Sequence, residues 1–109
     1  MNEEMVKKKS QELGISIDGT RRVLESAFKE SVRLVKELDV HCSGVNQSKI
    51  QEVTHRLKGV FANLQFVELS QSAQQINIAA AQNENILQII PQIKKLKEQY
   101  EFLRKEYDV

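Results

Sequence analysis

Tryptophan is absent from the 109-residue sequence, and cysteine, proline and glycine are scarce. With Cys42 as the one cysteine, no intramolecular disulfide can form, which is consistent with a reducing compartment. No apolar run approaches the roughly 20 residues that a membrane span needs, and the N-terminal residues lack the apolar core of a signal peptide. We therefore expect a cytoplasmic protein.

An excess of charge of one sign is also missing. Sixteen Lys and Arg stand against fifteen Asp and Glu, which leaves a net charge of +1 although charged residues make up 28% of the chain. This balance argues against nucleic-acid binding by bulk electrostatics and against a basic membrane-binding surface. The expected partners are therefore proteins.

Residues that favour helices dominate the composition, and strand signals are nearly absent. Apolar residues recur at helical spacing in four longer segments joined by short loops, which predicts an all-α fold, an antiparallel up-down-up-down four-helix bundle in a single domain over residues 1–109. A short extra N-terminal helix is expected across one end. The predicted helices span residues 2–13, 18–39, 50–69, 70–82 and 85–107.

Several residues define the expected boundaries. Asn2 is a candidate N-cap and Gly14 a candidate stop for the first helix, and either Asp18 or Thr20 could cap the second. The segment 40–47 is predicted to be a loop, with His41 near the C-terminal end of the helix before it. Pro91 either kinks a long last helix or begins a shorter one; we favour the kinked long helix.

The segment 50–69 carries the pattern that points to chemistry. At about 100° per residue, its apolar stripe has a mean direction roughly 180° from His55, so the histidine should face water. Gly59, Ala62 and Phe66 fall on or near the line of the histidine, with Lys58 and Gln51 flanking it. The stripe consists of Ile50, Val53, Leu57, Val60, Phe61, Leu64 and Val67.

Gly59 is unusual because a glycine in the middle of a helix costs about 1 kcal/mol relative to alanine. It lies one turn beyond an exposed histidine, and only a methyl group follows at Ala62. Clearance for something bulky at the imidazole edge would explain the glycine. Lys58 would place a cation beside that group.

A histidine followed by lysine and glycine at the third and fourth positions resembles the signature of histidine-containing phosphotransfer (HPt) domains of bacterial and eukaryotic phosphorelays. The resemblance implies that His55 carries a phosphoryl group, on Nε2, that Lys58 is its charge partner and that Gly59 gives steric clearance. It also implies a receiver domain and a histidine kinase as partners. The further matches are Ala62, Asn63, Leu64 and Leu69.

The chain departs from the family pattern at three positions. Most family members have small residues where this chain has Val60 and Phe61, and usually a glycine ten positions after the histidine, where this chain has Gln65. Because none of these changes removes a chemical group, they bear on the docking surface and on the helix end. The phosphotransfer role is less affected.

An exposed imidazole suits a phosphoryl carrier because its unperturbed pKa of about 6.5 leaves it largely neutral and nucleophilic at pH 7. The sequence contains no Walker loop and no carboxylate cluster for nucleotide or metal. Beside His41 and Cys42, the only further histidine is His55, too few ligands for a metal site. We therefore predict a carrier without a cofactor, and not an enzyme, whose catalysis comes from its partners.

Docking is expected around His55, with Gln51, Ala62 and Phe66 as partner-binding residues and Ser48 and Lys58 in a polar rim. Phe66 could instead fold against a neighbouring helix. Two other functions stay open: a docking adaptor that binds a kinase or receiver without being phosphorylated, and an unrelated helical assembly factor. A monomer is favoured because each helix has one dominant apolar face.

Overall fold

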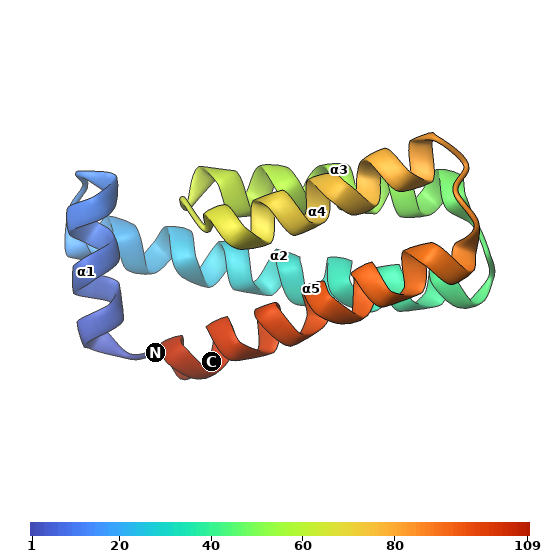
Figure 1. Ribbon diagram of the computed structural model, residues 1–109. Helices are drawn as coiled ribbons and strands as arrows, with labels where there is room; N and C mark the ends of the chain where they lie inside the picture. The colour runs from blue at the N-terminus through green and yellow to red at the C-terminus, as the bar shows by residue number, and fades with distance from the viewer.

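The computed structural model describes residues 1–109 and consists of helices and connecting turns, with no strand (Figure 1). The prediction of an all-α protein is confirmed. None of the helices combines the length and the apolar character needed to cross a bilayer. The five helices are α1 (Glu3–Leu13), α2 (Ile17–Ser43), α3 (Gln47–Asn63), α4 (Val67–Ala81) and α5 (Ile86–Tyr107).

Four of the helices run lengthwise beside one another, and α1 lies across one end (Figure 1). The molecule is elongated, 43 × 21 × 17 Å, because α2 alone has 27 residues and a helix rises about 1.5 Å per residue. Helix α3 packs most extensively on α4 and also on α2, whereas α1 contacts α2 and α5. The neighbours of α3 are therefore α2 on one side and α4 on the other.

A single hydrophobic core joins all five helices. Near its centre, the rings of Phe61 and Tyr100 lie 6.0 Å apart, and the Tyr100 hydroxyl and the Ser31 hydroxyl are hydrogen-bonded at 2.6 Å. Burial raises the pKa of Tyr100. This hydrogen bond satisfies both buried hydroxyl groups, which would otherwise destabilise the core.

The caps predicted for α1 are confirmed. The Asn2 side chain accepts hydrogen bonds from the backbone N–H groups of Glu4 and Met5, and Gly14 ends the helix with φ +69°. The Asn2 backbone N–H also donates to the Tyr107 carbonyl at 2.7 Å. These contacts fix the start of α1 against the end of α5.

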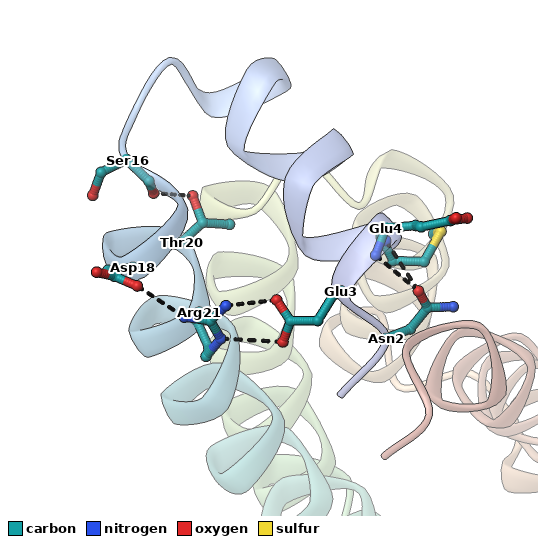
Figure 2. Close-up of polar contacts among 8 residues, drawn as sticks. Asn2, Glu3, Glu4, Ser16, Asp18, Thr20 and Arg21 are labelled. Carbon is teal, nitrogen blue, oxygen red and sulfur yellow. Dashed lines mark hydrogen bonds and ion pairs between the residues drawn. The ribbon is translucent and has the colours of Figure 1, made fainter.

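An ion-pair network fastens α1 to α2 at the same end (Figure 2). The Arg21 guanidinium pairs with Glu3 at 2.6 Å and with Asp18 at 2.9 Å. Its hydrogen bonds to Glu3 and Asp18 raise the pKa of Arg21, and the hydrogen bond from Arg21 lowers the pKa of Glu3. Because both carboxylates are solvent-exposed, the network orients α1 more than it stabilises the fold.

Beneath α1, three aromatic rings meet. The Phe66 ring lies 6.4 Å from Phe28 and 5.8 Å from Tyr107, and the Lys9 ammonium lies 4.5 Å from the Phe66 centroid. Burial raises the pKa of Tyr107 to about 12, with nearby carboxylates adding to the shift. Val6, which is fully buried, completes the contact between α1 and the core.

The predicted boundaries of α2 need correction at both ends. Ser16 caps the helix by accepting from the Gly19 N–H, so neither Asp18 nor Thr20 is the N-cap. At the other end the helix continues through Ser43, which reduces the predicted loop 40–47 to residues 44–46. His41 lies in the last turn, as predicted. The predicted loop began too early because Gly44 keeps a right-handed backbone conformation, and the chain first adopts a left-handed one at Val45, with φ +53°.

Helix α3 also ends earlier than predicted, at Asn63 and not at Leu69. Gln65 adopts a left-handed backbone conformation with φ +59°, and the Phe66 N–H donates to the Phe61 carbonyl at 2.9 Å. This hydrogen-bonding pattern closes a helix C-terminus. Helix α4 consequently begins at Val67, three residues before the predicted cap.

Pro91 lies inside α5 without ending it, so the length of the last helix is confirmed and the shorter alternative is wrong, whereas the kink stays a prediction. Asn85 caps α5 by accepting from the Leu87 N–H at 2.9 Å. The proline lacks the N–H that an interior helical residue donates to the preceding turn. Near the helix start this loss affects a single backbone hydrogen bond.

Gln65→Gly is expected to raise the free energy of unfolding by about 1 kcal/mol, because a left-handed conformation costs non-glycine residues roughly 1–2 kcal/mol and glycine very little. Urea unfolding followed by circular dichroism measures the change. Gln71→Gly, at an exposed position inside α4, is the matched control and should lower stability by a similar amount. A loss of stability in Gln65→Gly would contradict this account of the α3 end.

Candidate functional site

The middle of α3 holds His55 on its solvent side. The neighbouring Val53, Thr54 and Leu57 are buried, whereas His55 is exposed, as the helical periodicity predicted. The Thr54 hydroxyl donates to the Ile50 carbonyl at 2.8 Å, so it is satisfied within the helix. The imidazole is thus presented by a helix whose opposite face is fixed in the core.

A shallow depression surrounds the imidazole. Both walls are polar: one comes from α3 and the other from α4, through Asn77. The Asn77 side chain donates to the Gln51 carbonyl at 2.7 Å, which ties the two helices together beside His55. The lining residues are Ser48, Gln51, Glu52, His55, Arg56 and Asn77.

Three of these lining residues, Glu52, Arg56 and Asn77, were not predicted. Asn77 belongs to another helix, and no local pattern in the sequence relates it to His55. Arg56 directly follows the histidine and pairs with Glu30 of α2 at 3.6 Å. Its proximity to His55 was visible in the sequence, but its direction toward α2 depends on how the helices pack.

Lys58 is half-buried and lies one turn beyond His55, although it does not line the depression. The Lys58 carbonyl accepts a hydrogen bond from the Ser70 hydroxyl of α4 at 3.3 Å. Neither His55 nor Lys58 makes an ion pair within the chain. The lysine ammonium is therefore free to meet an anionic group brought to His55.

No contact within the chain requires residue 59 to be glycine. It is exposed and its backbone is helical, and a Cβ atom built at Gly59 would meet no heavy atom within 4 Å. Gly19 in α2 is different, because a Cβ atom there would lie 2.9 Å from the Ser16 hydroxyl. The space over Gly59 is open to solvent, so any steric requirement at this position comes from outside the molecule.

The predicted partner-binding residues separate into two groups. Gln51 and Ala62 are exposed on the same helix as His55. The prediction that Phe66 shares this face is wrong, because α3 ends at Asn63 and the chain turns before Phe66. Phe66 instead packs on Phe28, which is the alternative left open by the sequence.

The two bulky departures from the family pattern point into the protein. Phe61 is 2% exposed and packs on Tyr100, and Val60 is half-buried against the core on the α2 side. Val67, which was expected in the same stripe, is 59% exposed because it follows the end of α3. Val60 and Phe61 therefore do not obstruct the surface around His55.

His41 and Cys42, the other pair considered in the sequence, lie in the last turn of α2. Burial raises the pKa of the Cys42 thiol. Nowhere in the chain do three or more His, Cys, Asp or Glu side chains gather in a group that could hold a metal ion.

Comparison with known proteins gives one match. A family model described as "Hpt domain" matches residues 22–106, a range that contains α3, α4, most of α2, nearly all of α5, and His55. Helix α1 lies outside the matched range. No curated protein and no solved structure matches the chain.

Proposed function

This chain belongs to the Hpt domain family, and from that premise we propose that it is the histidine phosphotransfer protein of a two-component phosphorelay. His55 accepts a phosphoryl group and passes it to or from the aspartate of a receiver domain. Hpt domains are phosphocarrier modules, so one residue of this chain carries the phosphoryl group and the partner catalyses its transfer. The chain itself is a carrier and not an enzyme.

The observation that supports His55 most strongly is the surface around it. The imidazole is exposed, Lys58 has no ion-pair partner, and the space above Gly59 is empty. A nucleophile, a free cation and clearance for a second protein lie within about one helical turn of one another. Phosphoryl transfer relies on this kind of positioning and charge stabilisation.

In the proposed transfer, the His55 Nε2 lone pair attacks the phosphorus of an aspartyl phosphate on the receiver. A P–N bond forms while the P–O bond to the aspartate breaks, and its electron pair leaves with the carboxylate. Lys58 offsets negative charge on the phosphoryl oxygens. The reverse reaction uses the same groups, so the direction of flow is set by the partners.

We place the docking surface on the exposed face of α3, with Ala62 at its apolar centre and Gln51 and Ser48 at its rim. Phe66 is not included, because its ring is committed to the aromatic cluster beneath α1. The proposed partners are a receiver domain and a histidine kinase. The receiver brings its own aspartate and Mg²⁺.

We also propose that residues 1–109 form one domain and act as a monomer. Its four long helices are assigned the antiparallel up-down-up-down topology that the short connections favour. The shared core of all five helices supports one cooperative unit. Sedimentation and a single coincident unfolding transition by two probes would test both assignments.

The test is transfer of radiolabelled phosphate from a phosphorylated receiver or a promiscuous histidine kinase to the purified protein. A label that is lost in acid and kept in alkali is the expected result, since a phosphoramidate has this stability pattern. Absence of label from several donors would favour the docking adaptor that binds a kinase or receiver without phosphorylation. Binding of the same donors, measured separately, would then identify its partner.

Lys58→Ala is expected to slow phosphotransfer roughly ten- to hundred-fold, because one positioned charge is removed from the transition state. The free energy of unfolding should be nearly unchanged, since the Lys58 side chain makes no ion pair. Rapid-quench transfer kinetics measure the rate. Lys95→Ala, at an exposed and unpaired lysine of α5, is the control and should transfer at the wild-type rate. Equal rates for both variants would remove Lys58 from the mechanism.

A further inference from the structure

Helices α4 and α5 leave a groove of about 470 Å³ between the start of α4 and the C-terminal half of α5, here called the α4–α5 groove. It shares no residue with the depression around His55. More than half of its lining is apolar. The lining residues are Phe66, Val67, Glu68, Leu69, Glu98, Gln99, Phe102, Leu103 and Glu106.

Two large apolar side chains of this groove are open to solvent. Phe102 is 66% exposed and Val67 is 59% exposed, although they lie on different helices. Leaving apolar surface of this size in water forgoes the stabilisation that burial would give. Contiguous exposed apolar surface with a polar rim is typical of an interaction site.

The charge around the groove has one sign. Glu68 lies on the α4 side and Glu98 and Glu106 on the α5 side, with no lysine or arginine in the lining. None of the three carboxylates makes an ion pair, whereas the neighbouring Glu101 pairs with Arg104 at 3.2 Å. In a chain with nearly balanced charge, three unpaired carboxylates around one apolar groove select a cationic occupant.

The spacing indicates the form of that occupant. Glu98 and Glu106 are eight residues apart on one helix, which corresponds to about 12 Å along its axis. A partner helix lying in the groove would match them with cations at the same spacing on one flank and meet Glu68 with a cation on the other. Its apolar residues, at i, i+3, i+4 and i+7, would lie on Phe102 and Val67.

We propose that the α4–α5 groove docks a basic amphipathic helix of a partner protein. The lysine-rich helix α1 of a second copy does not supply such a helix, because it already buries Val6 in its own core. The docking leaves His55 uncovered, so one partner can remain bound while another exchanges phosphate. The proposal does not depend on phosphorylation of His55.

The probe for the test is a capped synthetic peptide of about four helical turns, with leucine at i, i+3, i+4 and i+7 and lysine on both flanks. A matched peptide carries glutamate in place of lysine. Binding to the ¹⁵N-labelled protein is followed by amide chemical shifts. The expected result is binding of the lysine peptide only, with shifts confined to the start of α4 and the second half of α5.

Three variants test the assignment. Phe102→Ala and the double variant Glu98→Lys/Glu106→Lys should each weaken binding at least tenfold. Leu87→Ala removes a side chain that is 71% exposed on the same helix but outside the groove, and should bind like the wild type. Because all of these side chains lie at the surface, circular dichroism should show an unchanged fold.

Several results would overturn the proposal. Equal affinity for the lysine and glutamate peptides would contradict the selection for a cationic partner. Failure of the lysine peptide to bind would contradict the proposed docking site. Shifts at His55, or at Cys42 and Ile90 in the adjoining groove between α2 and α5, would place the peptide elsewhere. The two grooves share Glu98 and Phe102, so the chemical shifts and not these variants distinguish them. Light scattering that shows a dimer which Phe102→Ala dissociates would assign the groove to a second copy.

Discussion

His55→Gln is expected to abolish phosphorylation from every donor while changing the free energy of unfolding by no more than about 0.5 kcal/mol. The imidazole is exposed and makes no ion pair, so its loss leaves the core and the helix caps intact. Glutamine keeps a polar side chain of similar length but has no nucleophilic nitrogen lone pair. Labelling with a phosphorylated receiver, followed by gel autoradiography, measures the loss.

The chain offers its own control for this result. His41 is the only other histidine and lies half-buried in the last turn of α2. His41→Gln should be labelled like the wild type. Label that persists in His55→Gln and disappears in His41→Gln would move the phosphoryl site, and acid-stable label in either protein would exclude a phosphohistidine.

Substitution of Gly59 should separate stability from transfer. Gly59→Ala is expected to raise the free energy of unfolding by about 1 kcal/mol, because alanine favours the helix interior and its Cβ would enter open space. For a domain of this size the gain corresponds to a melting temperature about 4–8 °C higher. Gly59→Leu should gain most of the same stability, since its side chain also points to solvent.

The rate of phosphotransfer should fall in the same variants that gain stability. A leucine side chain one turn beyond His55 would hold a docked receiver away from the imidazole, and a misplacement near 1 Å costs about 100-fold in rate. Gly59→Ala should show a smaller loss. Rapid-quench kinetics with one receiver would rank the variants, and transfer by Gly59→Leu at the wild-type rate would exclude a clearance role for Gly59.

Gly19→Ala is the control for the expected stability of the Gly59 variants. A Cβ atom at residue 19 would lie 2.9 Å from the Ser16 hydroxyl that caps α2. The cap must shift to make room, and loss of a cap costs about 1 kcal/mol. We therefore expect Gly19→Ala to be less stable than Gly59→Ala, with no effect on phosphotransfer. The contrast distinguishes a glycine needed by the fold from one needed at the surface.

Periodicity in the sequence was sufficient to predict which side of α3 faces the core. Ile50, Leu57 and Phe61 are buried and His55 is exposed, because the 3.6-residue repeat continues without interruption up to Asn63. Amphipathic helices fix their own orientation in this way. The geometry around His55 was therefore predictable wherever it depends on one helix.

Predictions failed where the backbone or a distant helix decides the outcome. The turn at Gln65 has a left-handed conformation without the glycine that usually signals it, so the helix end was placed too late and Phe66 was assigned to the wrong face. Asn77 reaches the site from α4 through a hydrogen bond to Gln51. Contacts between separate helices have no signature in a single sequence.

The hydrogen bond from the Asn2 N–H to the Tyr107 carbonyl brings the two ends of the chain together (Figure 1). A peptide linker of a few residues could therefore join them, and the chain could be opened instead at the exposed residues 82–83 of the turn between α4 and α5. Such a circular permutant would keep every helix and would place both new termini at the opposite end of the molecule. The same closeness of the ends would let the whole unit be inserted into a surface loop of another protein with little disturbance of its host.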